Sequence, residues 1–161
     1  MAEGRLKIVV FGSFNAGKSS FIQALDPGSR HIEATSKEGA TTVAFDFGRL
    51  QVRDWAVYLF GTPGQERFEF VREILARGMD GAIIVVDATR GVDAMTRHLY
   101  DRLKELEVPL AFMANKCDCP GAAPGTISRD LPGEMVHPIS ARNGENVYAA
   151  LDAFVATLVA R

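Results

Sequence analysis

Cysteine is scarce in this chain of 161 residues, which contains only Cys117 and Cys119, separated by a single residue. Neighbours this close rarely form a disulfide with each other. The sequence is therefore not that of a disulfide-stapled secreted scaffold, and a cytoplasmic location is expected. A C-x-C metal half-site would need further cysteines to complete it, and the sequence has none.

Long hydrophobic runs are also missing. No stretch of 18 apolar residues occurs, and the N-terminus lacks a signal-peptide pattern. Residue 2 is Ala2 rather than the glycine of an N-myristoylation signal, and the C-terminal residues include no prenylation cysteine. We therefore expect no intrinsic membrane anchor.

The chain also lacks an excess of charge of either sign. The formal net charge is -2, which argues against a broadly basic, nucleic-acid-coating surface, so no nucleic-acid partner is expected. The content of 47% hydrophobic and 24% charged residues is typical of a globular protein. A chain of this length can bury about 70% of its unfolded surface in one domain without a covalent staple.

Strand-like and helix-like segments alternate along the chain. The expected strands are 6–11, 42–52, 55–60, 81–87, 110–114 and 135–139, and the expected helices are 19–25, 68–77, 93–107 and 147–159. Any helix between residues 119 and 133 must be short because Pro and Gly recur there, and 29–41 reads as a loop. This order predicts a three-layer α/β sandwich with a mostly parallel, six-stranded sheet and one antiparallel strand.

Residues 12–19 read G-S-F-N-A-G-K-S, between an apolar strand and a helix-like segment. In that context the backbone N–H groups converge at the positive end of the helix dipole and form a cradle for phosphate. Lys18 would reach the β- and γ-phosphates, and the Ser19 hydroxyl would bind Mg²⁺. The plain alternative is a strand-to-helix turn without a ligand. The candidate phosphate-binding residues are Gly12, Asn15, Ala16, Gly17, Lys18, Ser19 and Ser20.

A second loop, N-K-C-D at 115–118, follows a later strand. The Asp118 carboxylate can accept hydrogen bonds from the N1–H and the exocyclic amine of guanine, whereas adenine offers no matching pair of donors. The stem of Lys116 can lie along the base, and Asn115 can tie this loop to the phosphate loop. Backbone N–H groups at Ser140 and Ala141, after the next strand, can meet the guanine O6. Since all these loops follow strands, they share the edge at which ligands bind in such sheets.

The ordered set of motifs resembles that of small Ras-like GTPases, built on the P-loop NTPase sandwich, over about residues 5–160. It comprises residues 12–19, T-P-G-Q-E at 62–66, N-K-C-D at 115–118 and S-A at 140–141. The segment T-V-A-F-D-F at 42–47 resembles the effector loop of Rab-type GTPases. The pattern F-G-T-P-G-Q is similar to that of prokaryotic Ras-like GTPases, including the group around the gliding-motility GTPase MglA.

The resemblance implies a single GTPase domain spanning residues 1–161 that binds GTP/GDP with Mg²⁺ and hydrolyses GTP, slowly without a partner. It implies that Thr42 binds Mg²⁺ and senses the γ-phosphate, with Thr41 as the immediate rival. It also implies that Gln65 positions the attacking water while Lys18 stabilises phosphate charge, and that Gly64 offers its N–H to the γ-phosphate. The segments 29–46 and 61–77 would act as switches that present a surface to an effector and a GTPase-activating protein. The MglA group implies a Roadblock-type partner; the oligomeric state stays open.

One departure from the family pattern concerns magnesium. Where D-x-x-G normally provides an Asp that holds a water on the metal, this chain has Gly61. Either magnesium binds more weakly or another carboxylate supplies the contact, and Asp46 is the candidate; a solvent-facing strand residue is the alternative for Asp46. The departure also sustains a second functional hypothesis, a GTP-binding adaptor with little or no intrinsic hydrolysis. A kinase built on the same phosphate loop is a weaker rival.

Overall fold

In the computed structural model, the described residues are 4–13, 15–35, 42–61 and 78–160, with only the backbone described for 32–35 and 42–45. They form a seven-stranded sheet in the order β2-β3-β4-β1-β5-β6-β7. The strands are β1 (Gly4–Gly12), β2 (Arg30–Thr35), β3 (Thr42–Val52), β4 (Trp55–Gly61), β5 (Gly81–Asp87), β6 (Leu110–Asn115) and β7 (Met135–Pro138). The helices are α1 (Lys18–Leu25), α3 (Ala94–Glu105), α4 (Pro124–Asp130) and α5 (Val147–Val159).

The predicted direction of the strands is confirmed, but their predicted number is wrong. Strand β3 pairs antiparallel with β2 and β4, and all other neighbouring strands pair in parallel, so β3 alone runs against the rest. The extra strand is β2, which lies within the segment 29–41 that we expected to be a loop. Among the described residues, this short strand sits at the edge of the sheet and pairs with β3 alone. Residues 31–35 alternate polar and apolar side chains, but the segment 29–41 as a whole is polar and shows no clear period, so this short strand did not stand out within it.

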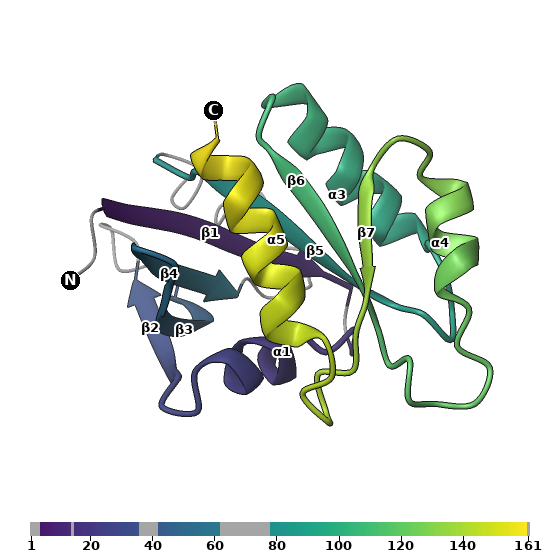
Figure 1. The fold of residues 1–161 in the computed structure, drawn as a ribbon, viewed down its shortest axis with the longest axis horizontal. Coiled ribbons are helices and arrows are strands. Elements are labelled where there is room, and N and C mark those ends of the chain that lie inside the picture. The colour runs from purple at the N-terminus through teal and green to yellow at the C-terminus, as the bar shows by residue number, and fades with distance from the viewer. Residues whose placement is uncertain (1–3, 14, 36–41, 62–77, 161) are drawn as a thin grey trace.

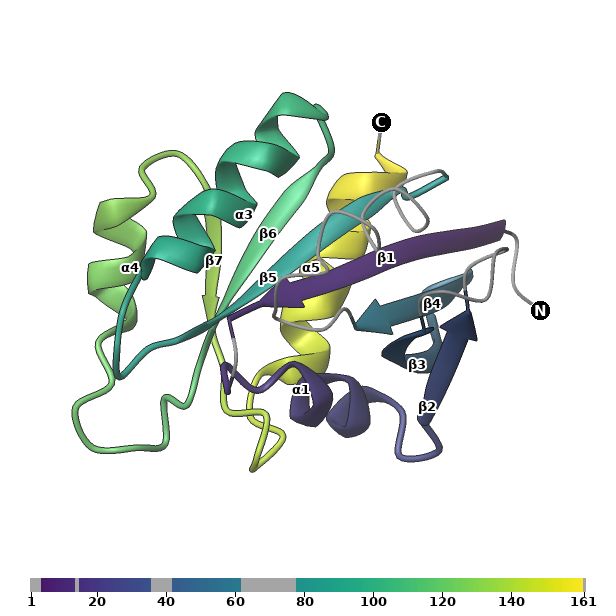
Figure 2. The same ribbon diagram turned by 180° about the vertical axis from the view of Figure 1, so that it is seen from behind.

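The central strands are buried because helices cover both faces of the sheet (Figures 1 and 2). Helices α1 and α5 pack on one face, with Phe21 and Phe154 among the buried side chains there. Helices α3 and α4 pack on the other, with Leu103 and Ile127 in its core. Burial on both faces explains the continuous apolar run of β5, whose first six residues are all buried.

The helices agree with their sequence signals where the structure describes them. Helix α3 begins after Asp93, whose carboxylate accepts a hydrogen bond from the Thr96 N–H, and ends with Arg102 and Lys104 in its last turn. Helix α4 has seven residues, as the Pro- and Gly-rich flanks require. The expected helix 68–77 lies outside the described residues. None of the described helices has the length and apolar character that crossing a bilayer requires.

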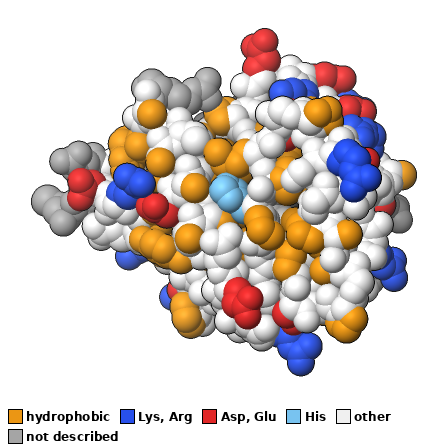
Figure 3. Space-filling view, turned by 45° about the vertical axis from the view of Figure 1, so that its right-hand side comes forward, with side chains coloured by type: hydrophobic (Ala, Val, Ile, Leu, Met, Phe, Trp, Pro, Cys, Tyr) orange, Lys and Arg blue, Asp and Glu red, His pale blue; other side chains and the backbone are white. Residues whose placement is uncertain are grey.

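The face of the molecule in Figure 3 shows hydrophobic side chains gathered around a histidine, with acidic and basic side chains toward the rim. The carboxyl ends of β1, β5 and β6 reach the same edge of the sheet, where α1 also begins. The pairs Gly12–Val85 and Asp87–Asn115 set this alignment. The loops that carry the sequence motifs therefore meet at this edge.

Candidate functional site

The phosphate loop turns sharply between β1 and α1. Asn15 and Gly17 have φ values of 67° and 103°, so the backbone takes the left-handed region twice within three residues. Gly17 also lies against the side-chain amide of Asn115, and a Cβ atom at this position would overlap that nitrogen. Glycine is required here for both reasons. The turn leaves the first N–H groups of α1 facing the loop interior, which suits an anion.

Lys18 lies over this loop rather than in solvent. Its Nζ donates a hydrogen bond to the Gly12 carbonyl oxygen at 3.1 Å. Burial lowers the pKa of Lys18, and the nearby negative charge of Asp46 opposes this shift. A partly buried ammonium group beside a helix N-terminus is stabilised by a bound anion, as phosphate binding would require.

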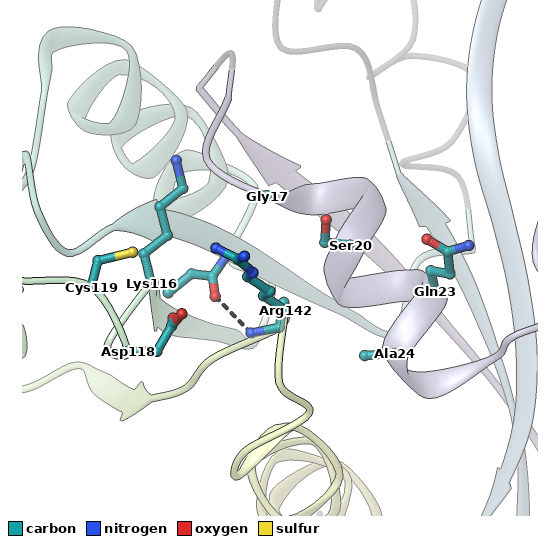
Figure 4. A pocket seen from close by; sticks show the side chains of 10 residues that line it. Gly17, Ser20, Gln23, Ala24, Lys116, Asp118, Cys119 and Arg142 are labelled. Carbon is teal, nitrogen blue, oxygen red and sulfur yellow. Dashed lines mark hydrogen bonds between the residues drawn. The ribbon is translucent and has the colours of Figure 1, made fainter.

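Asn115 joins three loops that come from different strands. Its Nδ2 donates to the Ala16 carbonyl oxygen at 3.0 Å, and its Oδ1 accepts from the Ala141 N–H at 2.9 Å. The latter bond is drawn as a dashed line in Figure 4. Asn115 is only 3% exposed, so the two bonds satisfy a buried amide. The predicted link between the loop at 115–118, called the base loop below, and the phosphate loop at 12–19 is thus present.

A cavity of about 630 Å³ opens between α1 and the base loop (Figure 4). Asp118 and Lys116 line it together with Ala141, and the Ser140 hydroxyl donates to Asp118 Oδ1 at 2.9 Å. This bond orients the carboxylate that the sequence assigns to guanine. The remaining lining residues are Gly17, Ser20, Gln23, Ala24, Asn115, Cys119 and Arg142.

A second cavity, of about 580 Å³, lies over the phosphate loop and shares Gly17, Ser20 and Lys116 with the first. The two cavities therefore lie side by side along the same edge of the sheet. The combined cleft offers a carboxylate at the base loop and N–H groups with an ammonium at the phosphate loop. It can hold a ligand that carries a hydrogen-bonding base at one end and phosphates at the other. The second cavity is also lined by Ser13, Asn15, Ala16, Lys18, Ser19, Asp87, Arg90, Gly91, Asp93 and Thr96.

Two carboxylates of this cleft were not anticipated from the sequence. Asp87 ends β5 and contacts Lys116 Nζ at 3.1 Å. Burial favours its neutral form, but hydrogen bonds from Thr89 and the charge of Lys116 outweigh burial and lower the pKa of Asp87. Its position at the carboxyl end of a buried strand was the available signal, since the other motifs were placed by the same rule.

Asp93 is the second of these carboxylates, and it ties the phosphate loop to α3. Ser13 Oγ donates to the two Asp93 oxygens at 2.8 and 2.7 Å. Burial again favours the neutral acid, but the hydrogen bonds from Thr96 and Ser13 outweigh it and lower the pKa of Asp93. The Asp93 carboxylate thus serves the helix cap and the loop together.

Asp46 lies beside Ser19, as a magnesium contact at this position would require. The Ser19 hydroxyl donates to Asp46 Oδ2, and the register of β3 and β4 sets Asp46 opposite Gly61. A Cβ atom at Gly61 would lie 2.6 Å from Ile22 Cδ1 and 3.6 Å from Asp46 Cβ. A side chain at residue 61 would therefore have to displace Ile22, and the carboxylate at this point comes from the neighbouring strand.

The hydroxyl of Ser19 and the carboxylate of Asp46 are hard oxygen donors of the kind that Mg²⁺ prefers, so the residues fit this ion. No group of three or more His, Cys, Asp or Glu side chains among the described residues can hold a metal. Magnesium would therefore also need phosphate oxygens and water. Of the other predicted residues, Thr42 begins β3 with only its backbone described, and Thr41, Gly64 and Gln65 lie outside the described residues.

Comparison with known proteins shows which family the chain resembles in sequence. The model of the elongation factor Tu GTP-binding domain matches residues 3–160. The chain is 35% identical over 118 residues to the uncharacterized protein MJ1339 of Methanocaldococcus jannaschii, covering 73% of this chain and 74% of that protein. It is 32% identical over 157 residues to translation initiation factor IF-2 of Alkaliphilus oremlandii, covering 90% of this chain but 21% of the factor. The chain thus spans about a fifth of that factor's length.

Solved structures share the fold at lower identity. The G domain of the T. maritima FeoB iron transporter is 22% identical, with a TM-score of 0.72 over 96% of this chain and 99% of that one. Elongation factor SelB of Methanococcus maripaludis, in complex with the GTP analogue GppNHp, is 22% identical, with a TM-score of 0.75 over all of this chain and 35% of SelB. These likenesses establish the P-loop GTPase fold.

Proposed function

The chain belongs to the family of elongation factor Tu GTP-binding domains, and from this premise we propose that it is a molecular switch that hydrolyses GTP to GDP and phosphate. The observation that carries the proposal is the pair of adjacent cavities, one at the phosphate loop and one at Asp118, with Asn115 bonded to Ala16 beside the first and to Ala141 beside the second. A ligand with guanine at one end and phosphates at the other matches these cavities in shape and polarity.

In the proposed reaction, the N–H groups of the phosphate loop and Lys18 stabilise the charge that develops on the phosphate oxygens. When bound, magnesium neutralises charge on the β- and γ-phosphates. Ser19, Asp46 and Thr42 are the residues that would hold it. The amide of Gln65 would orient the attacking water, and the N–H of Gly64 would contact the γ-phosphate.

The proposal also covers the segments that would respond to the nucleotide and the proteins that would bind them. Loss of the γ-phosphate contacts would release the segments 29–46 and 61–77, which would change the surface offered to an effector and to a GTPase-activating protein. The resemblance to the MglA group makes a Roadblock-type protein our candidate partner. The alternative, an adaptor that signals by nucleotide occupancy with little hydrolysis, is favoured by one specific observation, the glycine at residue 61.

Two measurements test the proposal. Binding of fluorescent GTP, GDP and ATP should show a strong preference for guanine nucleotides; ATP bound as tightly as GTP would favour a kinase instead. Single-turnover hydrolysis with Mg²⁺ should proceed at about 10⁻⁴ to 10⁻² s⁻¹ without a partner. Gln65→Leu should retain GTP binding and lose hydrolysis. If wild-type protein shows no turnover even with candidate partners present, the adaptor function replaces the switch.

A further inference from the structure

We propose that His31 is a positioning residue for the Asp46 carboxylate, and that edge strand β2 thereby sets the affinity of the site for magnesium. The inference rests on the proposed role of Asp46 at the metal. It assigns His31 no contact with nucleotide or metal; the residue acts through Asp46.

The geometry divides the two oxygens of one carboxylate between two partners. Asp46 Oδ2 accepts from the Ser19 hydroxyl in the phosphate loop, whereas Asp46 Oδ1 lies 3.1 Å from His31 Nδ1. The register of the antiparallel pair β2–β3 places His31 directly opposite Asp46. Directly opposed side chains on one face of such a pair are close enough to interact, so the contact follows from the pairing of the strands.

The need for such a contact arises on the other side of Asp46. There the register places Gly61, which carries no side chain, and Ile22 occupies the space that one would fill. Nothing from residue 61 restrains the carboxylate. His31 and Ser19 are the hydrogen-bonding partners that the described structure gives to the Asp46 carboxylate. Without His31, only the hydrogen bond from Ser19 would restrain the carboxylate plane, whose terminal torsion has a broad energy minimum.

Because the His31–Asp46 pair is exposed, we expect it to orient the carboxylate rather than to stabilise the fold. The His31 side chain is 64% exposed, and an ion pair in solvent contributes little to folding. Partners that orient a metal ligand matter in a different way, because their loss typically weakens metal binding by about 10- to 100-fold. The neutral imidazole can donate from Nδ1, so this role does not depend on a charged histidine.

The experiment compares amides that differ in where they place the donor. In His31→Asn, the amide nitrogen takes the place of Nδ1; in His31→Gln it lies farther out, near the place of Nε2. The concentration of free Mg²⁺ that half-maximally slows the release of fluorescent GDP is measured for both variants and for His31→Ala. Mn²⁺ binding, followed by electron paramagnetic resonance, gives a second readout that does not depend on turnover. His98→Ala, which removes an exposed histidine of α3, is the control.

We expect His31→Ala and His31→Gln to raise the half-maximal Mg²⁺ concentration about tenfold, with His31→Asn close to wild type. GDP affinity at saturating Mg²⁺ and the Tm of the unliganded protein should not change. Equal Mg²⁺ requirements for wild type and His31→Ala, or equal effects of Asn and Gln, would overturn the inference. If Asp46→Ala also leaves the requirement unchanged, the proposed metal role of Asp46 fails; if Asp46→Ala alone raises it, only the role of His31 fails.

Discussion

Gly61 on β4 and Asp46 on β3 face each other across the antiparallel pair, so the strand position opposite the Asp46 carboxylate carries no side chain. Ile22 of α1 packs into the space that a side chain at residue 61 would need. The family motif normally carries a carboxylate at residue 61. In this chain a carboxylate reaches the Ser19 hydroxyl from the adjacent strand instead.

The packing of Ile22 against Gly61 predicts a coupled pair of substitutions. Gly61→Ala should destabilise the protein by about 1–3 kcal/mol, because its Cβ would overlap Ile22 Cδ1. Ile22→Val removes that atom and should cost about 0.5–1.5 kcal/mol alone. The double variant should lose less stability than the sum of the two single variants, as measured by urea unfolding. Strictly additive losses would show that the two residues do not compete for this space.

The loops joined by Asn115 should separate without it. Asn115→Ala leaves the Ala16 carbonyl and the Ala141 N–H without their partner, so we expect a loss of about 1–3 kcal/mol in the free energy of unfolding. GTP affinity should fall as well, because both ends of the cleft lose their common anchor. Asn143→Ala, at an exposed position three residues after Ser140, is the matched control and should change neither quantity. Equal behaviour of the two variants would refute the link.

The choice of base should follow Asp118. In Asp118→Asn, one acceptor oxygen is replaced by a donor group, so the preference should move from guanine toward xanthine nucleotides. Competition binding of GTP and XTP measures the change. Ser140→Ala, which removes the 2.9 Å hydrogen bond to Asp118, should weaken GTP binding without reversing the preference. An unchanged preference in Asp118→Asn would exclude Asp118 as the base-reading residue.

His137 on β7 should make the protein sensitive to acid. Burial lowers its pKa below the ordinary 6.5, and its buried Nε2 has no hydrogen-bond partner among the described residues. Between the lowered pKa and 6.5 the unfolded chain binds more protons than the folded one, so this group lowers stability as the pH falls through 6.5.

Replacing this side chain with one that does not titrate removes its share of the pH dependence. From about pH 7.5 to about pH 5.5, the urea midpoint of wild type should therefore fall more than that of His137→Phe. Carboxylates titrate in both proteins, so the comparison isolates the histidine. Parallel pH profiles would mean that His137 titrates alike in the folded and unfolded chains.

The sequence predicted most elements because their signals are local. The apolar run of β5 and the glycine-containing turn before Lys18 can each be recognised within a few residues. Strand β2 was missed because its alternation of polar and apolar residues covers only residues 31–35 of a largely polar segment, and among the described residues it is held by pairing with the distant strand β3. Asp87 was missed as a site residue although it lies at a strand end, because no motif was known to include it.

The sequence by itself specified the residues on which the proposed chemistry rests. A phosphate loop, an amide link and a carboxylate that would read guanine need particular residue types at particular spacings, and these can be read along the chain. The tertiary structure decided which carboxylate lies beside Ser19, given that Gly61 supplies none. Whether Asp46 meets Ser19 on one side and His31 on the other depends on the register of β2, β3 and β4, and this register is set by hydrogen bonds between segments far apart in the sequence.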